Sequence, residues 1–172
     1  MSAGSLQAAL VAISPARRAS VSTEAIEGST NGRTEARLYC EGTAVAVWEA
    51  LERSAAYPIS VDILNRRAGG DAAGALRAPF VLGDTDELHS LFTSAGAPAV
   101  SIETHTGTAR FPSVRTTVEA DLRGWLPVMG VVLEDDLVDE ILAETEEALG
   151  EFVTAEGEMV FDAPAHIVSV QL

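Results

Sequence analysis

GTAVAVW, residues 42–48, is the clearest strand signal in the sequence. It is a short apolar run that contains β-branched residues, and polar residues bound it on both sides. Such a run is typical of a strand that neighbouring elements cover on both faces, as in a parallel sheet. We therefore expect a buried strand here.

Two helices are predicted directly after this strand. Residues 58–67 carry apolar side chains at helical spacing, and Pro58 suits the first turn, where its missing N–H costs nothing. Gly69 and Gly70 are expected to stop that helix. Asp71 then has the character of an N-cap for a short second helix.

Capping residues mark the next two helices. Asp84 precedes Glu87 at the spacing of a capping box, and Gly96 stands where the following helix is expected to stop. Ser113 is the expected cap of a helix over residues 114–124, and we interpret the apolar residues 125–130 as a loop. The longest helix is predicted over residues 133–149. Its core-facing side chains are Val138, Ile141, Leu142 and Leu149.

Extended segments complete the pattern. One strand is predicted over residues 99–106, with an extension past Gly107 to Phe111. Residues 159–161 and 165–172 are also expected to be extended, with Pro164 interrupting them. Strands that alternate with helices in this way indicate an α/β fold.

Composition indicates one acidic domain and argues against nucleic acids and anionic membranes as partners. The chain has 172 residues, which suits a single domain with a sizeable core. It has 11 basic and 26 acidic residues, so the net charge is −15. This charge repels the phosphate backbone of nucleic acids and anionic membrane surfaces, so we expect neither as a partner.

Residues 1–40 differ in character from the rest of the chain. They hold few large apolar side chains, so we expect a poorly structured or divergent N-terminal segment, followed by one domain over residues 41–172. Cys40 is the single cysteine, which rules out an intrachain disulfide and fits a cytoplasmic location. No apolar stretch approaches the ~20 residues that cross a bilayer, so a membrane-spanning role is not expected.

Several stretches together carry a resemblance to a known family. Besides residues 42–48 they are LYCEG at 38–42, LRAPFVLGD at 76–84, residues 88–96, RGWLP at 123–127 and FDAPAHIV at 161–168. As a series they resemble the C-terminal half of class I S-adenosylmethionine-dependent methyltransferases. The similarity is to the actinobacterial type related to ubiquinone and menaquinone methyltransferases, and it covers residues 42–172.

The resemblance implies part of a Rossmann-like methyltransferase sheet with flanking helices. The implied strands are equivalents of the fifth, seventh and sixth, which are neighbours in that sheet, with the last one antiparallel. The implied activity is methyl transfer from S-adenosylmethionine to a small molecule. In this family a glycine-rich turn after the first strand holds the cofactor.

That glycine-rich turn is missing from this sequence. Gly28 and Gly32 lie in a polar stretch without a preceding strand, whereas Gly69, Gly70 and Gly74 lie between helices. S-adenosylmethionine is therefore a cofactor by resemblance only, and we do not expect this chain to bind it. We expect a truncated methyltransferase-like protein that is inactive alone.

Four residues are candidates for substrate binding. Trp48 ends the first predicted strand, where open α/β sheets bind ligands, and core packing is its alternative role. Arg123 and Trp125 lie in the segment that covers the substrate in the resembling family, where an Arg beside an aromatic ring suits an acidic or aromatic ligand. Their alternative is a surface Arg over an apolar loop. Met129 either lines an apolar pocket or fills core space.

No residue is predicted to be catalytic or to bind a metal. His105, at the end of a predicted strand, is the best general-base candidate, but sequence spacing places no carboxylate to orient it. The three histidines are scattered, and no Cys/His cluster has metal-ligand spacing.

A second hypothesis treats the chain as a non-catalytic binding or dimerisation module. The fourth strand of the methyltransferase sheet is missing by resemblance, which leaves a sheet edge that needs a cover. The expected partners are therefore a small-molecule substrate and a second copy or partner chain over that edge.

Overall fold

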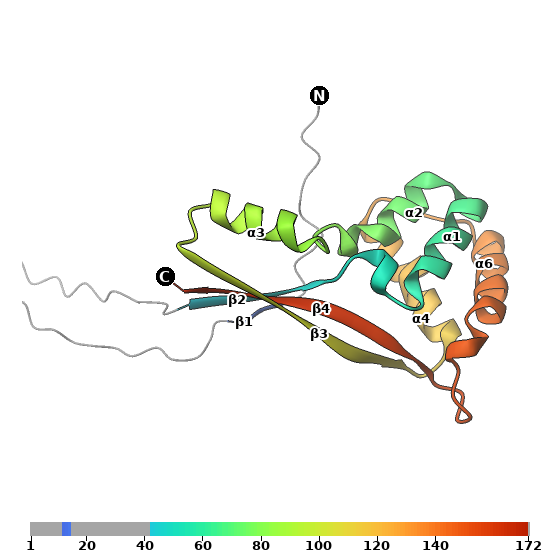
Figure 1. Cartoon of the computed structure of the whole chain (residues 1–172). Helices are drawn as coiled ribbons and strands as arrows, with labels where there is room; N and C mark the ends of the chain where they lie inside the picture. Colours follow the sequence, from blue (N-terminus) through green and yellow to red (C-terminus); the bar gives the residue numbers. More distant parts are fainter. Residues whose placement is uncertain (1–11, 15–41, 172) are drawn as a thin grey trace, which may run out of the picture.

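The computed structural model describes residues 12–14 and 42–171. They form a small antiparallel sheet with helices on one face and at one end (Figure 1). The elements in chain order are β1 (Ala12–Ser14), β2 (Gly42–Trp48), η1 (Leu51–Arg53), α1 (Tyr57–Ala68), α2 (Gly70–Arg77), η2 (Ala78–Phe80), α3 (Thr85–Ser94), β3 (Ala99–Phe111), α4 (Val114–Ala120), η3 (Asp121–Trp125), α5 (Leu126–Val128), α6 (Asp135–Ala148), η4 (Gly150–Phe152) and β4 (Met159–Gln171).

The strands lie in the order β1-β2-β4-β3, and every neighbouring pair is antiparallel. Because β2 and β3 both run antiparallel to β4, they run parallel to each other on either side of it. The expected α/β fold with an antiparallel last strand and flanking helices is confirmed at this level. The predicted equivalence to methyltransferase strands stays a prediction.

The parallel pairing that the apolar run of β2 suggested is wrong. Val45 and Val47 point into the core, whereas Ala44 and Ala46 on the other face are partly exposed. Alanine counts as apolar, so the one-sided alternation of an antiparallel strand was hidden in a continuous run.

One core cluster lies between the sheet and α3. It joins Leu88 of α3, which is fully buried, to Val45, Val47, Val168 and Val170 of the two central strands. Figure 1 shows α3 lying along this face of the sheet. The cap of α3 is as predicted, because the Asp84 side chain accepts from the backbone N–H groups of Asp86 and Glu87, both at 2.9 Å.

A larger core cluster lies at the end of the sheet, among α1, α2, α4 and α6 (Figure 1). The predicted core face of α6 is confirmed, since Val138, Ile141, Leu142 and Leu149 are all buried. Ser113 caps α4 as expected, and its hydroxyl accepts from the N–H of Thr116.

Asp71 does not cap α2. The N-cap is Gly69, whose φ of 88° favours glycine, and Asp71 lies inside the first helical turn. Gly69 is both the C-cap of α1 and the N-cap of α2. The N-cap position is therefore already occupied, and Asp71 falls inside the helix.

The predicted interruption at Pro164 is also wrong, because β4 runs without a break from Met159 to Gln171. The Pro164 carbonyl accepts from the N–H of Glu49, which lies just beyond the end of β2. In a strand the backbone N and O of one residue point to the same side. The nitrogen of Pro164, which carries no hydrogen, therefore faces β2 and not β3, at a position where β2 has already ended. Proline therefore removes no bond from the β3–β4 ladder.

The predicted apolar loop over residues 125–130 is helical in its first part. After α4 the chain continues through the π-helical turn η3 into α5. Leu122 and Leu126, four residues apart, are both buried in the helical core, which explains why the helix continues. Asp121 and Trp125 keep the same four-residue spacing on another face of this turn.

His166 ties the sheet to the segment before α3. It is 2% exposed, and its Nε2 lies 3.0 Å from the Gly83 carbonyl oxygen while its Nδ1 lies 2.8 Å from the Thr104 hydroxyl. A carbonyl oxygen only accepts, so the proton is on Nε2 and the Thr104 hydroxyl donates to Nδ1.

His166→Leu is expected to lower the free energy of unfolding by about 2 kcal/mol, because the Gly83 carbonyl and the Thr104 hydroxyl lose their partner. Urea denaturation measures this change. The matched control is His105→Leu, since His105 is exposed and its Nε2 lies 3.4 Å from the Glu103 carboxylate. We expect less than ~0.5 kcal/mol there. Equal losses in both variants would contradict a structural role for His166.

The N-terminal segment is described only at β1. These three residues pair with Ala44–Ala46 of β2, on the edge where a partner chain was predicted. The rest of the predicted N-terminal segment lies outside the described residues, and the partner chain stays a prediction. No helix within the described residues combines the length and apolarity that crossing a membrane requires.

Candidate functional site

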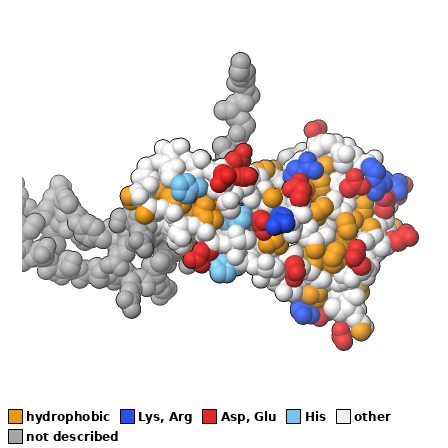
Figure 2. Space-filling model, viewed as in Figure 1, with side chains coloured by type: hydrophobic (Ala, Val, Ile, Leu, Met, Phe, Trp, Pro, Cys, Tyr) orange, Lys and Arg blue, Asp and Glu red, His pale blue; other side chains and the backbone are white. Residues whose placement is uncertain are grey.

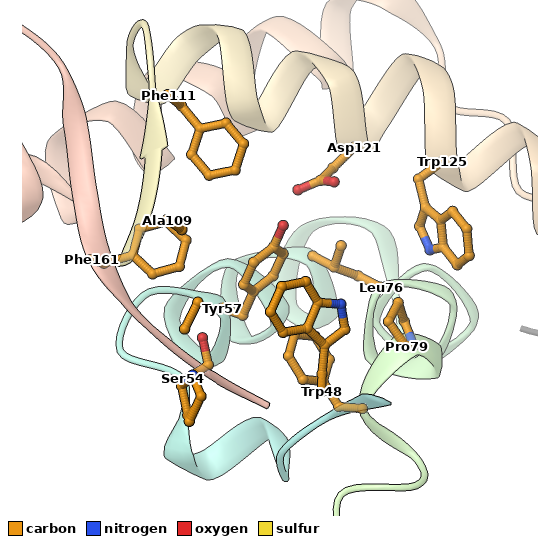
Figure 3. Close-up of a pocket in the computed structure, with 13 residues that line it drawn as sticks. Trp48, Ser54, Tyr57, Leu76, Pro79, Ala109, Phe111, Asp121, Trp125 and Phe161 are labelled. Atoms are coloured by element: carbon orange, nitrogen blue, oxygen red, sulfur yellow. The ribbon is translucent and has the colours of Figure 1, made fainter. Parts of the chain in front are cut away.

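A cavity of about 300 Å³ opens where β2 and β3 end and β4 begins (Figure 3). This volume is at the small end of the range for ligand pockets, about 300–1,000 Å³. Thirteen residues line it. They are Trp48, Ser54, Tyr57, Leu76, Pro79, Phe80, Ala109, Phe111, Asp121, Trp125, Phe161, Ala163 and Pro164.

The strands supply one wall of this pocket. Trp48 is the last residue of β2. Ala109 and Phe111 of β3, like Phe161 and Ala163 of β4, are two residues apart, so each pair points to one face of its strand. A small and a large side chain alternate along each strand, which leaves space beside the rings.

The aromatic rings pack against one another as well as against the cavity. The Tyr57 ring centroid lies 5.2 Å from that of Phe80 and 6.0 Å from that of Phe161, in tilted and edge-on arrangements. Phe111 stacks on Phe161 at 6.0 Å. These contacts are in the range that stabilises aromatic pairs, so the rings hold their positions without a ligand.

The Trp125 ring is held by a hydrogen bond. Its Nε1–H donates to the backbone carbonyl of Ala75 in α2, at 2.8 Å. The bond joins η3 to α2 across the pocket rim and satisfies the one polar atom of the indole. The ring is therefore left with apolar surface to offer the cavity.

Asp121 is the one acidic residue of the lining. Burial raises the pKa of its carboxyl from 3.8 to about 7. Within the described part of the chain, no side chain forms a hydrogen bond or ion pair with this carboxylate. Figure 3 shows it directed into the cavity, facing the Tyr57 hydroxyl. Such a group exchanges a proton near neutral pH, as a general acid or base must.

Tyr57 remains a neutral phenol. Burial, and then the negative charge of Asp121, raise the pKa of its hydroxyl well above the usual value. The pair thus presents a polar O–H and an ionisable carboxyl at one point of a mostly apolar chamber, whose described lining also includes the Ser54 hydroxyl.

No basic side chain lines the pocket among the residues that the structure describes. Arginines instead lie on the surface beside acidic side chains, over the helical end in Figure 2. Arg66 and Arg67, for example, both pair with Glu144 of α6, at 2.8 and 2.6 Å. The Asp121 charge therefore has no counterion inside the chamber.

The structure brings two of the four predicted substrate-binding residues together. Trp48 and Trp125 both line the pocket (Figure 3). Arg123 lies outside it, where its guanidinium pairs with Glu119 and Asp135 on the surface. Met129 is partly buried against the larger core and does not line the cavity. Roles in substrate binding stay predictions for all four residues.

Sequence reasoning did not select Asp121 and Tyr57. One signal was available for Asp121, since it precedes Trp125 by one helical turn and is followed by the core residue Leu122. Tyr57 gave no signal beyond its place before Pro58. His105, the earlier general-base candidate, is exposed on β3 and outside the pocket.

Metal chemistry has no support in the described residues. They contain no group of three or more His, Cys, Asp or Glu side chains that could hold an ion. The pocket is instead an aromatic chamber with a single titratable acid, which suits the binding of a small apolar molecule.

Comparisons with known proteins add no family assignment. No protein-family model matches the chain, and no curated protein matches it either.

Proposed function

We propose that this chain is the substrate-side half of an S-adenosylmethionine-dependent small-molecule methyltransferase, and that its own task is to bind an apolar small molecule. The observation that carries the proposal is the position of the aromatic pocket. It lies against the last residue of β2 and the C-terminal part of β3, and in open α/β sheets this is the end of the strands where ligands bind.

The strand order supports the methyltransferase part of the proposal. The order β2-β4-β3, with β4 antiparallel, is the order that the resemblance implies for the fifth, seventh and sixth strands of the family.

The described residues do not fit the cofactor. S-adenosylmethionine needs a glycine-rich turn after a strand, where backbone N–H groups can approach it. Here β2 continues into Glu49 and Ala50, and β3 continues into Pro112 and Ser113. Neither strand end offers the bare backbone that the cofactor requires.

The pocket residues bind and orient rather than react with the ligand in this proposal. Six rings exclude water from the chamber, and the Trp125 and Tyr57 rings are fixed by their neighbours. Holding a small molecule in one orientation is the main contribution of this half to a transfer reaction, because positioning lowers the entropic part of the barrier.

Two titrations of the full chain test the proposal. Calorimetry with S-adenosylmethionine is expected to show no micromolar binding. The neutral aromatic alcohol 2-phenylethanol is expected to change the tryptophan fluorescence, since both tryptophans of the chain line the pocket. Micromolar cofactor binding would contradict the missing-loop argument. An unchanged emission with every aromatic probe would contradict the pocket.

A cavity-filling variant locates the binding site. Ala109→Phe is expected to abolish the fluorescence response to 2-phenylethanol, because the added ring occupies the chamber that Ala109 lines. Ala143→Phe, on the exposed face of α6, is the matched control and is expected to respond like the unmodified chain. A full response from Ala109→Phe would place the bound probe elsewhere.

A further inference from the structure

The carboxylate of Asp121 determines which kind of molecule suits the pocket. Asp121 is directed into a chamber whose other walls are mostly rings and aliphatic side chains, with the Ser54 hydroxyl among them. No basic group of the described lining neutralises it. We propose that the pocket selects a protonated organic amine, whose apolar body lies among the rings and whose ammonium group pairs with Asp121. The inference rests on the proposed function, since it names the substrate class of the same pocket.

Charge complementarity is the first argument. A carboxylate that loses water on burial is costly unless a cation pairs with it, and the residues that the structure describes provide none inside the chamber. An incoming ammonium group supplies the missing counterion. The net charge of −15 also attracts cations towards the protein and repels anions.

The aromatic walls are the second argument. A cation within about 6 Å of a ring face is attracted by the negative face of the π-system. Trp48 and Trp125 line the same chamber as Asp121, and the Tyr57 hydroxyl faces the carboxylate from α1 (Figure 3). Rings on several sides and one acid on the wall suit an alkylammonium group, whereas a carboxylate ligand would meet like charge.

The protonation state of Asp121 sets the pH range of this selectivity. With a pKa of about 7, the free carboxyl is mostly ionised at about pH 8 and mostly neutral at about pH 5.5. The residues that line the chamber and the small cavity beside it with Asp121 are Tyr57 from α1, which stays neutral, three hydroxyl side chains (Ser54, Ser60 and Thr117) and apolar residues, so none of them carries a charge. The nearest charges on its own segment, Arg123 and Glu119, pair with each other outside the pocket.

Three probes with one ring and different charges test the inference: 2-phenylethylamine, 2-phenylethanol and phenylacetate. The readout is the emission of Trp48 and Trp125 during titration of the full chain. At about pH 8 the amine is expected to bind at least tenfold more tightly than the alcohol, and phenylacetate at least tenfold more weakly. At about pH 5.5 the amine's advantage is expected to disappear.

A matched pair of variants assigns the selectivity to one carboxylate. Asp121→Asn is expected to remove the amine's tenfold preference over the alcohol. Asp162→Asn removes the same charge from an exposed position on β4 and is expected to retain the tenfold preference. Alcohol binding without any preference for the amine would overturn the inference and leave the proposed pocket standing. Failure of all three probes to bind would overturn both.

Discussion

Gly83→Ala is expected to lower the free energy of unfolding by about 3 kcal/mol or more. A Cβ on Gly83 would lie 2.1 Å from the backbone N and 2.4 Å from the Cα of Ala50. Because those atoms are backbone, no side chain can turn aside, and two segments must move apart. Thermal unfolding is expected at a midpoint ~6–12 °C lower.

The control for this variant is Gly74→Ala. An added Cβ at Gly74 meets nothing within 4 Å, and the residue lies inside α2. Alanine is the better helix former, so the control is expected to gain about 0.5–1 kcal/mol. A Gly83 variant as stable as the unmodified chain would contradict the close approach of the segment before α3 to the end of β2.

Asp121 is expected to make the protein less stable as the pH rises from about 4 to 7. Its pKa is raised from 3.8 to about 7 in the folded state, so over this range the folded chain binds more protons than the unfolded chain. The free energy of unfolding falls with rising pH over the range in which the folded state binds more protons than the unfolded state. A difference of three pKa units corresponds to at most about 4 kcal/mol, reduced by the partial exposure of the side chain.

Asp121→Asn isolates this contribution. The amide cannot ionise, so the variant is expected to be more stable than the unmodified chain at about pH 8 and nearly equal to it at about pH 4. Urea denaturation at both pH values measures the two differences. Asp162→Asn is the exposed control, and its effect is expected to be small at either pH. A Asp121→Asn variant that is less stable at about pH 8 would show that the charge is satisfied in the folded chain.

The loss of stability and the proposed selectivity for amines, which both depend on Asp121, have one cause. The chamber removes water from the carboxylate, and its described lining offers no counterion, which costs stability and leaves the charge available to a cationic ligand. Binding sites often retain such a cost because the same arrangement provides selectivity.

Helices and their ends could be predicted because their signals are local. The Asp84 and Ser113 caps lie within three residues of the N–H groups that they satisfy. The buried face of α6 follows from the spacing of its apolar side chains. Each of these features depends on neighbours along the chain, so no knowledge of the distant fold was needed.

Strand pairing could not be predicted in the same way. The continuity of β4 through Pro164 depends on where β2 ends beside it, although more than 100 positions separate them in the chain. The apolar run of β2 on its own suggested a parallel sheet, because alanines masked its two-faced pattern. Pairing is a contact between distant segments, and local spacing carries little information about it.

The sequence by itself determined the places of the helices, most of their caps and the strands that flank them, together with Trp48 at a strand end. Only the tertiary structure decided that Asp121 lies in a chamber where no other described residue supplies a counterion. Its environment comes from α1, α2 and the ends of three strands, and the field at a buried carboxyl depends on all of them at once. The pKa of a carboxyl depends on the atoms around it, and around Asp121 those atoms come from segments far apart in the chain.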